Sequence, residues 1–210
     1  MFIDQPVKEF LEKVASGEPV PGGGSVAALC GALSAVLMEM VGRLTVCKSR
    51  DQALDAKMSS LMETAARLRL HLTEDMDRDS DAFTAVMEAY GMAKGTDEEK
   101  KARQAAIQSA LKDAVRVPLS VAEIGVRLLD LAEIAVEEGN QSAVTDAAVA
   151  ALMARSAVLG ALYNVRINLA SVKDAGFRAE LTREAERLEQ KAVAKEKEIL
   201  SIVSSIMRQV

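Results

Sequence analysis

The chain has 210 residues and is 50% hydrophobic, so one domain with a sizeable core is expected. Its formal net charge of −5 argues against binding to nucleic acid or to an anionic membrane surface. Aromatic residues make up only 3%, while alanine, leucine, valine and methionine are abundant, and this composition favours helices packed through small and unbranched side chains.

Neither a secretory signal nor a membrane span is expected. Charged residues interrupt the first nine positions, and the longest apolar run, residues 26–38, is too short to cross a bilayer. Cys30 and Cys47 fall in one predicted helix, about 25 Å apart, which is too far for a disulfide within the chain. Two free thiols indicate a cytoplasmic protein, and the single histidine makes a metal site unexpected.

The first predicted helix is short and amphipathic and runs from Pro6 to Gly17. A second, much longer helix is predicted from about Ser25 to Cys47, with Ser25 as its N-cap. Its many alanines and glycines let neighbours approach on several sides, so it should lie at the centre of the fold or at a dimer interface. Residues 19–24, rich in proline and glycine, form either a sharp turn or, with the free N–H groups of the first helical turn, a cradle for an anion.

A third helix is predicted over residues 53–90, which contain no internal proline or glycine. Asp79 falls inside its apolar stripe, between Leu72 and Phe83. A carboxylate on an apolar face must be paired or must have a raised pKa, and a raised pKa is what a general acid or base needs. Asp79 is therefore either a structural or a catalytic residue. The other carboxylates of this run are expected at the edge of the stripe or in solvent: Asp75, Asp77 and Asp81.

Four further helices complete the expected order. The fourth should begin at the capping box of residues 96–99 and end or kink at Pro118. A fifth follows and stops at Gly139. The sixth, from about residue 142 to 169, is apolar almost all round and should be buried. The last, from about residue 176 to 206, is charged and one-sided, so it should cover the bundle or pack on a second subunit.

The sixth helix carries the polar residues of most interest. Asn140 can cap either the fifth helix or the sixth, and Asp146 lies in the first two turns, where a carboxylate suits the helix dipole. Gly160, Asn164 and Asn168 share one stripe at i, i+4 and i+8. Asparagine on a buried helix needs partners, which could be helix ends, a symmetric dimer or a ligand. With no strand candidate, repeat or linker, the sequence predicts one all-α domain over residues 1–210, a bundle of six or seven helices with a long central helix.

Three segments together resemble the cyclodeaminase/cyclohydrolase family of folate enzymes. They are residues 19–29 (PVPGGGSVAAL), 139–147 (GNQSAVTDA) and 163–169 (YNVRINL), and residues 79–83 and Val117-Pro118 also match in order and spacing. The family includes the cyclodeaminase half of formiminotransferase-cyclodeaminase and stand-alone bacterial methenyltetrahydrofolate cyclohydrolases. The resemblance covers nearly the whole chain.

The resemblance implies an all-helical, usually dimeric protein with no metal or redox cofactor. It implies action on the one-carbon unit carried between N5 and N10 of tetrahydrofolate. One reaction is the cyclohydrolase interconversion of 5,10-methenyltetrahydrofolate and 10-formyltetrahydrofolate, which we favour because no formiminotransferase domain is present. The alternative is the cyclodeaminase, which releases ammonia from formiminotetrahydrofolate. A catalytically silent, folate-binding or structural homodimer is the remaining alternative.

The resemblance also implies where the site lies. Asp79 is the expected acid/base, and Asn140 and Asp146, with Asn164 and Asn168, would orient the pterin, the attacking group or Asp79 itself. The other expected binding residues, which would hold an anionic part of folate such as its glutamate tail, are Pro21, Gly22, Gly23, Gly24, Ser25 and Lys48. Lys48 matches the family pattern, whereas three neighbours depart from it and bear on substrate preference or activity: Arg43, Cys47 and Ser49.

Overall fold

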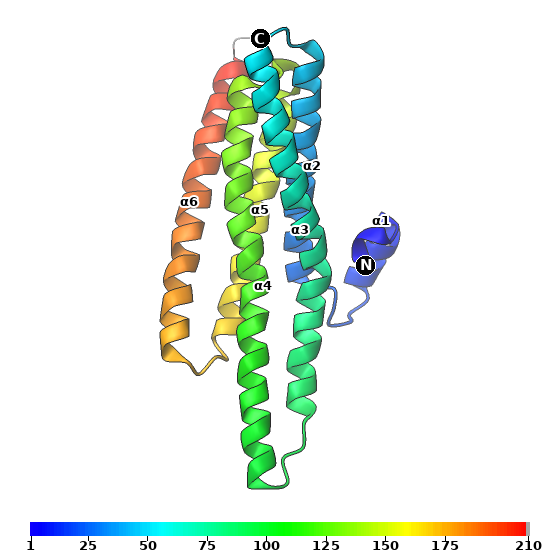
Figure 1. Ribbon diagram of the computed structural model, residues 1–210, viewed down its shortest axis with the longest axis vertical. Helices are drawn as coiled ribbons and strands as arrows, with labels where there is room; N and C mark the ends of the chain where they lie inside the picture. The colour runs from blue at the N-terminus through cyan, green and yellow to red at the C-terminus, as the bar shows by residue number, and fades with distance from the viewer. Residues whose placement is uncertain (209–210) are drawn as a thin grey trace.

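Long helices lie side by side in the computed structural model, which describes residues 1–208 (Figure 1). The α-helices of these residues are α1 (Val7–Ala15), α2 (Gly23–Lys48), α3 (Gln52–Gly91), α4 (Asp97–Glu138), α5 (Val144–Leu169) and α6 (Ala175–Met207). Two short 3-10 turns, η1 (Phe2–Asp4) and η2 (Gln141–Ala143), complete the order, and no strand occurs within residues 1–208. The predicted all-α class is confirmed.

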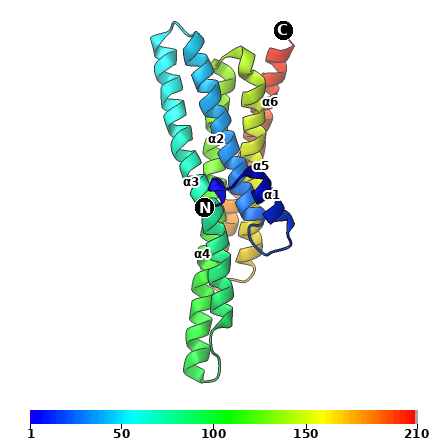
Figure 2. The same ribbon diagram turned by 90° about the vertical axis from the view of Figure 1, so that its right-hand side faces the viewer.

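Helices α2 and α5 run antiparallel through the middle of the bundle, side by side in Figure 2. Small residues set their close approach, because a Cβ at Gly160 would lie 3.2 Å from the Cβ of Ala27. At Gly31 an added Cβ would lie 3.0 Å from Leu72 and 3.5 Å from Ala157. The prediction of a central helix with a thin surface is confirmed, and this α2–α5 contact is called the small-residue seam below.

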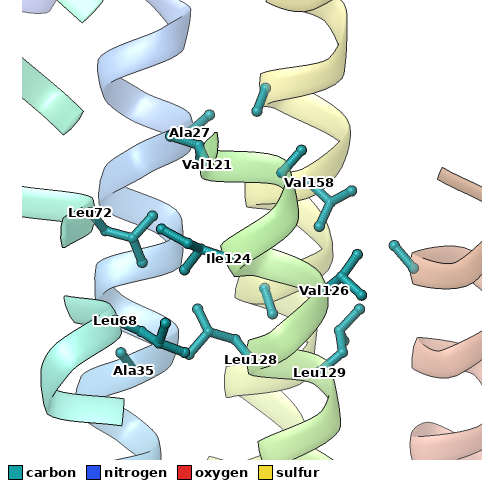
Figure 3. Close-up of a cluster of buried hydrophobic side chains, with 14 of the residues drawn as sticks. Ala27, Ala35, Leu68, Leu72, Val121, Ile124, Val126, Leu128, Leu129 and Val158 are labelled. Carbon is teal, nitrogen blue, oxygen red and sulfur yellow. The ribbon is translucent and has the colours of Figure 1, made fainter. Parts of the chain in front are cut away.

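The core continues from this seam into α3 and α4. Figure 3 shows Leu68 and Leu72 of α3 and Leu128 of α4 converging on the α2 side, while Val158 of α5 lies on the other side of α4. Leu72, Leu128 and Val158 are fully buried, so this cluster removes large aliphatic side chains from water. Burial of this kind fixes the relative positions of the four helices that surround the candidate site.

Pro118 does not end a helix, so the predicted boundary between a fourth and a fifth helix is wrong. A single helix, α4, continues through it, and Pro118 is buried. Proline has no N–H, so the carbonyl of Ala114 loses its intrahelical donor. The side-chain amide of Asn168 donates to that carbonyl at 2.7 Å. A neighbouring helix thus replaces the missing hydrogen bond, and residues 1–208 form six α-helices, the lower of the two numbers predicted.

Other helix ends follow the local signals of the sequence. The capping box at Thr96 and Glu99 is present in full, as predicted. Asn140 caps η2 at the entry to α5, where its side-chain oxygen accepts from the N–H of Ser142 at 3.1 Å. Asp174, which precedes α6, accepts from the N–H of Phe177 at 3.0 Å.

Two segments are long and apolar enough to cross a membrane by length and composition alone: α2 and residues Gln141–Leu169. The expectation that no apolar run is long enough therefore fails on this test, because α2 extends well past the run of residues 26–38. Much of each segment is buried in the bundle, and the rest forms an exposed apolar surface. We call it the α2/α5 face; its large exposed side chains are Leu33, Val36, Leu44, Val149, Leu152, Tyr163 and Ile167.

Candidate active site

A pocket of about 330 Å³ opens where the start of α2 meets the C-terminal halves of α3 and α5. Its lining combines polar and apolar residues, and the apolar ones include Phe83, Val86 and Tyr90 of α3 and Leu111 of α4. The polar part of the lining brings together much of the predicted site. Its residues include Gly22, Gly23, Gly24, Asp79, Asn164 and Asn168.

The carboxylate of Asp79 lies over the first turn of α2, where helical N–H groups have no partner within the helix. Burial raises the pKa of Asp79, hydrogen bonding from Ser25 offsets part of that rise, and the nearby negative charge of Asp75 adds to it. A methyl group at Gly24 would overlap the carboxylate, so glycine is required there for Asp79 to come this close. The raised pKa makes this carboxyl group a better proton acceptor than an ordinary aspartate and, once protonated, a possible proton donor.

The anion at the glycine-rich stretch is therefore the carboxylate of Asp79, a group of the protein itself. Gly22, not Ser25, is the N-cap of α2, so that part of the prediction is wrong. Ser25 is fully buried in the first turn, and its hydroxyl donates to the carbonyl of Met76 at 2.8 Å. This bond fastens the start of α2 to α3 next to Asp79. Pro21 is buried beside the loop and does not line the pocket.

The acidic run on α3 is arranged differently from the prediction. Asp75 is only 1% exposed, and its Oδ1 accepts from Arg78 at 2.6 Å. Burial raises the pKa of Asp75, and the charge of Arg78 opposes this rise. Asp77 is half-buried and accepts from the N–H of Phe2 at 3.0 Å, so only Asp81 lies in solvent as expected. The helical wheel failed here because α4 and the N-terminal segment cover sides of α3 that the apolar pattern left open.

Asn164 and Asn168 stand one turn apart on α5, and both line the pocket. The side-chain nitrogen of Asn164 donates to the carbonyl of Gly160 at 2.9 Å, as that of Asn168 does to Ala114. Each amide group is thereby held in place by its nitrogen. The side-chain oxygens remain as the atoms able to accept hydrogen bonds from a ligand.

The aromatic residues of the pocket were missed as part of the site. Phe83 was placed on the apolar stripe of α3, yet it is 39% exposed, and Tyr90 further along the same helix is 45% exposed. The guanidinium of Arg103 stacks over the Tyr90 ring at 5.7 Å and donates to its backbone carbonyl at 2.9 Å, which fixes this residue. The available signal was that the apolar stripe of α3 continues beyond Asp79, the candidate catalytic carboxylate, to Phe83 and Tyr90.

Three predicted site residues lie far from the Asp79 pocket within the same chain. Lys48 is the last residue of α2, and the first residues of α2 line the pocket. The helix has 26 residues and is about 37 Å long, so Lys48 lies about that distance from the pocket. Asn140 lies at the same far end, because its N–H donates to Thr45 at 2.9 Å, and Asp146 follows in the first turn of α5. Within one chain, Lys48 therefore cannot hold the same group as the glycines, and neither Asn140 nor Asp146 reaches Asp79.

Comparison with known proteins now identifies the fold and the family. Residues 6–187 match the family model described as formiminotransferase-cyclodeaminase. A methenyltetrahydrofolate cyclohydrolase of Methylorubrum extorquens is 41% identical over 202 residues, covering 96% of this chain and 97% of that protein. The formimidoyltransferase-cyclodeaminase of Sus scrofa is 36% identical over 191 residues, 91% of this chain but only 35% of that longer protein.

The solved structures give the same result. The crystal structure of a formiminotetrahydrofolate cyclodeaminase from Thermotoga maritima superimposes with a TM-score of 0.88 and 29% identity, covering 99% of this chain and 100% of that one. The match extends over the helices that form the pocket, since almost the whole chain is aligned. This chain therefore belongs to the formiminotransferase-cyclodeaminase family.

Proposed function

We propose that this protein is a methenyltetrahydrofolate cyclohydrolase, which converts 5,10-methenyltetrahydrofolate and water to 10-formyltetrahydrofolate. The observation that carries the proposal is the Asp79 carboxyl, whose pKa is raised by burial, at the edge of a pocket with aromatic residues in its lining. The end-to-end similarity to the Methylorubrum cyclohydrolase supports this reaction over others of the family. Tetrahydrofolate carries the one-carbon unit as substrate.

The reaction removes two protons from the attacking water, places one of them on N5 and releases the other. As water attacks the methenyl carbon, the Asp79 carboxylate accepts a proton from it, and a C–O bond forms. The bond from that carbon to N5 then breaks, and the protonated Asp79 gives its proton to N5. The hydroxyl group of the intermediate loses its remaining proton to solvent and becomes the formyl carbonyl, so the hydrolysis of the methenyl cation releases one proton overall. A carboxyl with a raised pKa suits both steps. The cationic methenyl bridge of the substrate is also complementary to the negative charge of Asp79.

The remaining pocket residues bind and orient the folate. Phe83 and Tyr90 provide apolar surface for the flat pterin ring. The side-chain oxygens of Asn164 and Asn168 accept hydrogen bonds from its N–H groups. Because both amides are tied to backbone carbonyls, their positions are set before the ligand arrives, which lowers the entropy lost on binding.

Asp79→Asn tests the central role. The decay of methenyltetrahydrofolate absorbance should slow by at least about a hundredfold relative to wild type after subtraction of the spontaneous rate. Asp81→Asn is the matched control, since Asp81 lies two residues away on the same helix but in solvent, and its turnover should stay at the wild-type level. A folded Asp79→Asn protein with full turnover would remove Asp79 from the mechanism.

The cyclodeaminase reaction is the second candidate, supported by the fold match to the Thermotoga maritima enzyme. The same carboxyl would relieve N10 of its proton and protonate the departing ammonia. Ammonia release from formiminotetrahydrofolate, measured on the same preparation, separates the two reactions. Folate binding without either turnover would instead indicate a silent binding protein, and the changes at Arg43, Cys47 and Ser49 would then need examination.

We propose further that the active form is a homodimer in the cytoplasm, joined through the α2/α5 face. This face carries large exposed apolar residues along two neighbouring helices, a pattern typical of interfaces. Helix α1 also exposes apolar side chains, since Phe10 is its one buried residue while Val7 and Leu11 are exposed. The two free cysteines, Cys30 and Cys47, are consistent with a reducing compartment.

A two-fold axis across the middle of this face would set the far end of one α2 over the pocket of its partner. That end carries Lys48, Asn140 and Asp146, and the pocket lining includes no cation for the glutamate of folate. Mixing inactive Asp79→Asn with inactive Lys48→Ala subunits tests the arrangement. Random pairing should restore about one quarter of wild-type turnover if Lys48 acts across the interface, and none if it acts within its own chain.

A further inference from the structure

A second hollow lies between the end of α5 and the start of α6, at the junction of these helices in Figure 1. It has a volume of about 550 Å³ and shares no lining residue with the Asp79 pocket. The α5 residues of the two hollows interleave along the sequence, so the hollows open on different sides of the helix. Three arginines line this groove, which we call the arginine groove: Arg166, Arg178 and Arg183.

The side of α6 in the groove is built from small residues. Ala175, Ala179 and Thr182 recur at i, i+4 and i+7 and so share one side of the helix. On a helical wheel Arg178 and Arg183 fall on either edge of that small-residue strip. Large side chains at the three central positions would fill the space, whereas alanine and threonine leave it open with a cation on each side.

The charges of the groove are only partly compensated. Arg166 is paired with Glu189, but within residues 1–208 neither Arg178 nor Arg183 has a carboxylate within 4.0 Å. Further along α6, Arg187 and Lys191 each have an acidic partner. The groove lining contains no acidic residue, in a protein whose net charge is negative. Arg178 and Arg183 thus keep their guanidinium donors for a ligand.

We propose that the arginine groove is a second binding site, for a small anion with two or more carboxylate or phosphate groups. Guanidinium groups bind both acids through paired N–H donors, and Thr182 adds a hydroxyl between the two free arginines. The floor of Leu169 and alanine side chains suits the hydrocarbon links between acidic groups. The site is separate from Asp79, so its occupation does not depend on the reaction proposed above.

Titration calorimetry tests the site with two probes, tri-γ-glutamate for a chain of carboxylates and inorganic pyrophosphate for phosphate. Arg178→Ala/Arg183→Ala should weaken binding of the preferred probe by at least about tenfold, because two charged donors are lost. Both arginines are exposed, so circular dichroism and thermal unfolding should show an intact fold. The control is Arg187→Ala/Lys197→Ala, which removes the same charge from α6 outside the groove and should leave affinity within about twofold.

The outcomes separate cleanly. Tri-γ-glutamate binding that depends on the groove arginines identifies carboxylates as the ligand chemistry, and pyrophosphate binding alone identifies phosphate. The proposal is overturned if wild type binds neither probe. It is also overturned if the control variant weakens binding as much as the groove variant, since that result would reflect general charge.

Discussion

Gly24→Ala should separate activity from folding, because the three atoms nearest to its added methyl group all belong to the Asp79 carboxylate. The nearest carboxylate oxygen would lie 2.1 Å from the added Cβ, so it has to retreat by about 1.3 Å before the two groups reach ordinary van der Waals contact. Its own side chain can turn outward into the pocket to do so, since Asp79 lies at the pocket edge. The backbone of α2 and α3 can then stay in place.

The expected effect of Gly24→Ala combines two opposing changes in the free energy of unfolding with one change in turnover. Alanine is favoured over glycine in a helix by roughly 0.5–1 kcal/mol. Loss of hydrogen bonding from Ser25 costs roughly 0.5–1.5 kcal/mol, and release of the carboxylate from burial offsets part of that cost. The free energy of unfolding should therefore change by no more than about 1 kcal/mol. A displacement of about 1 Å in a catalytic group, by contrast, lowers turnover by about a hundredfold.

Gly23→Ala is the matched control, since it makes the same change one residue earlier. A Cβ there would lie 3.6 Å from the side-chain nitrogen of Asn164, an ordinary contact. Urea unfolding and the methenyltetrahydrofolate assay on both variants give the comparison. If Gly24→Ala keeps as much turnover as Gly23→Ala, the close contact between α2 and Asp79 has no role in catalysis and the reasoning fails.

Three further outcomes are expected. Asp79→Asn should be more stable than wild type at neutral pH: burial raises the folded-state pKa of Asp79, so its ionised form opposes folding. That stability advantage should vanish as the pH falls below the ordinary aspartate pKa of 3.8, and thermal unfolding of both proteins across pH measures the change. An advantage that persists in acid would contradict the prediction. Thr45→Val leaves the N–H of Asn140 without its acceptor and should lower the free energy of unfolding by about 1–3 kcal/mol, measured in urea; an unchanged midpoint would mean that water replaces the hydroxyl. Gly125→Ala places a methyl 2.6 Å from Val158 and should destabilise by about 1–3 kcal/mol in the same assay, whereas a stabilised variant would show that α4 and α5 can move apart.

Helix ends were predictable because their signals are local. The box at Thr96 and Glu99 and the stop at Gly139 depend on hydrogen bonds between residues a few positions apart. Pro118 was misread for the opposite reason. The amide that compensates for it, on Asn168, is 54 positions away from the carbonyl that it satisfies, and no local pattern contains that contact.

The candidate site was predictable in part. Asp79 and the asparagines at 164 and 168 stood out as polar groups on apolar helix faces, and the structure brings them to one pocket. The sequence does not show which residues from different helices lie together at the same end of the bundle. Lys48 and Asn140 were therefore grouped with Asp79 although a whole length of α2 separates them.

The small-residue seam limits how relatives of this protein can diverge. Gly160 faces Ala27 across the seam, and a methyl group added at Gly160 would lie only 3.2 Å from the Ala27 Cβ, so the neighbour would have to shift. A larger residue at one of these positions requires a smaller one opposite or a shift of the helix. Substitutions along the seam should therefore appear in pairs across an alignment of the family, while positions on the outer side of α6 vary independently.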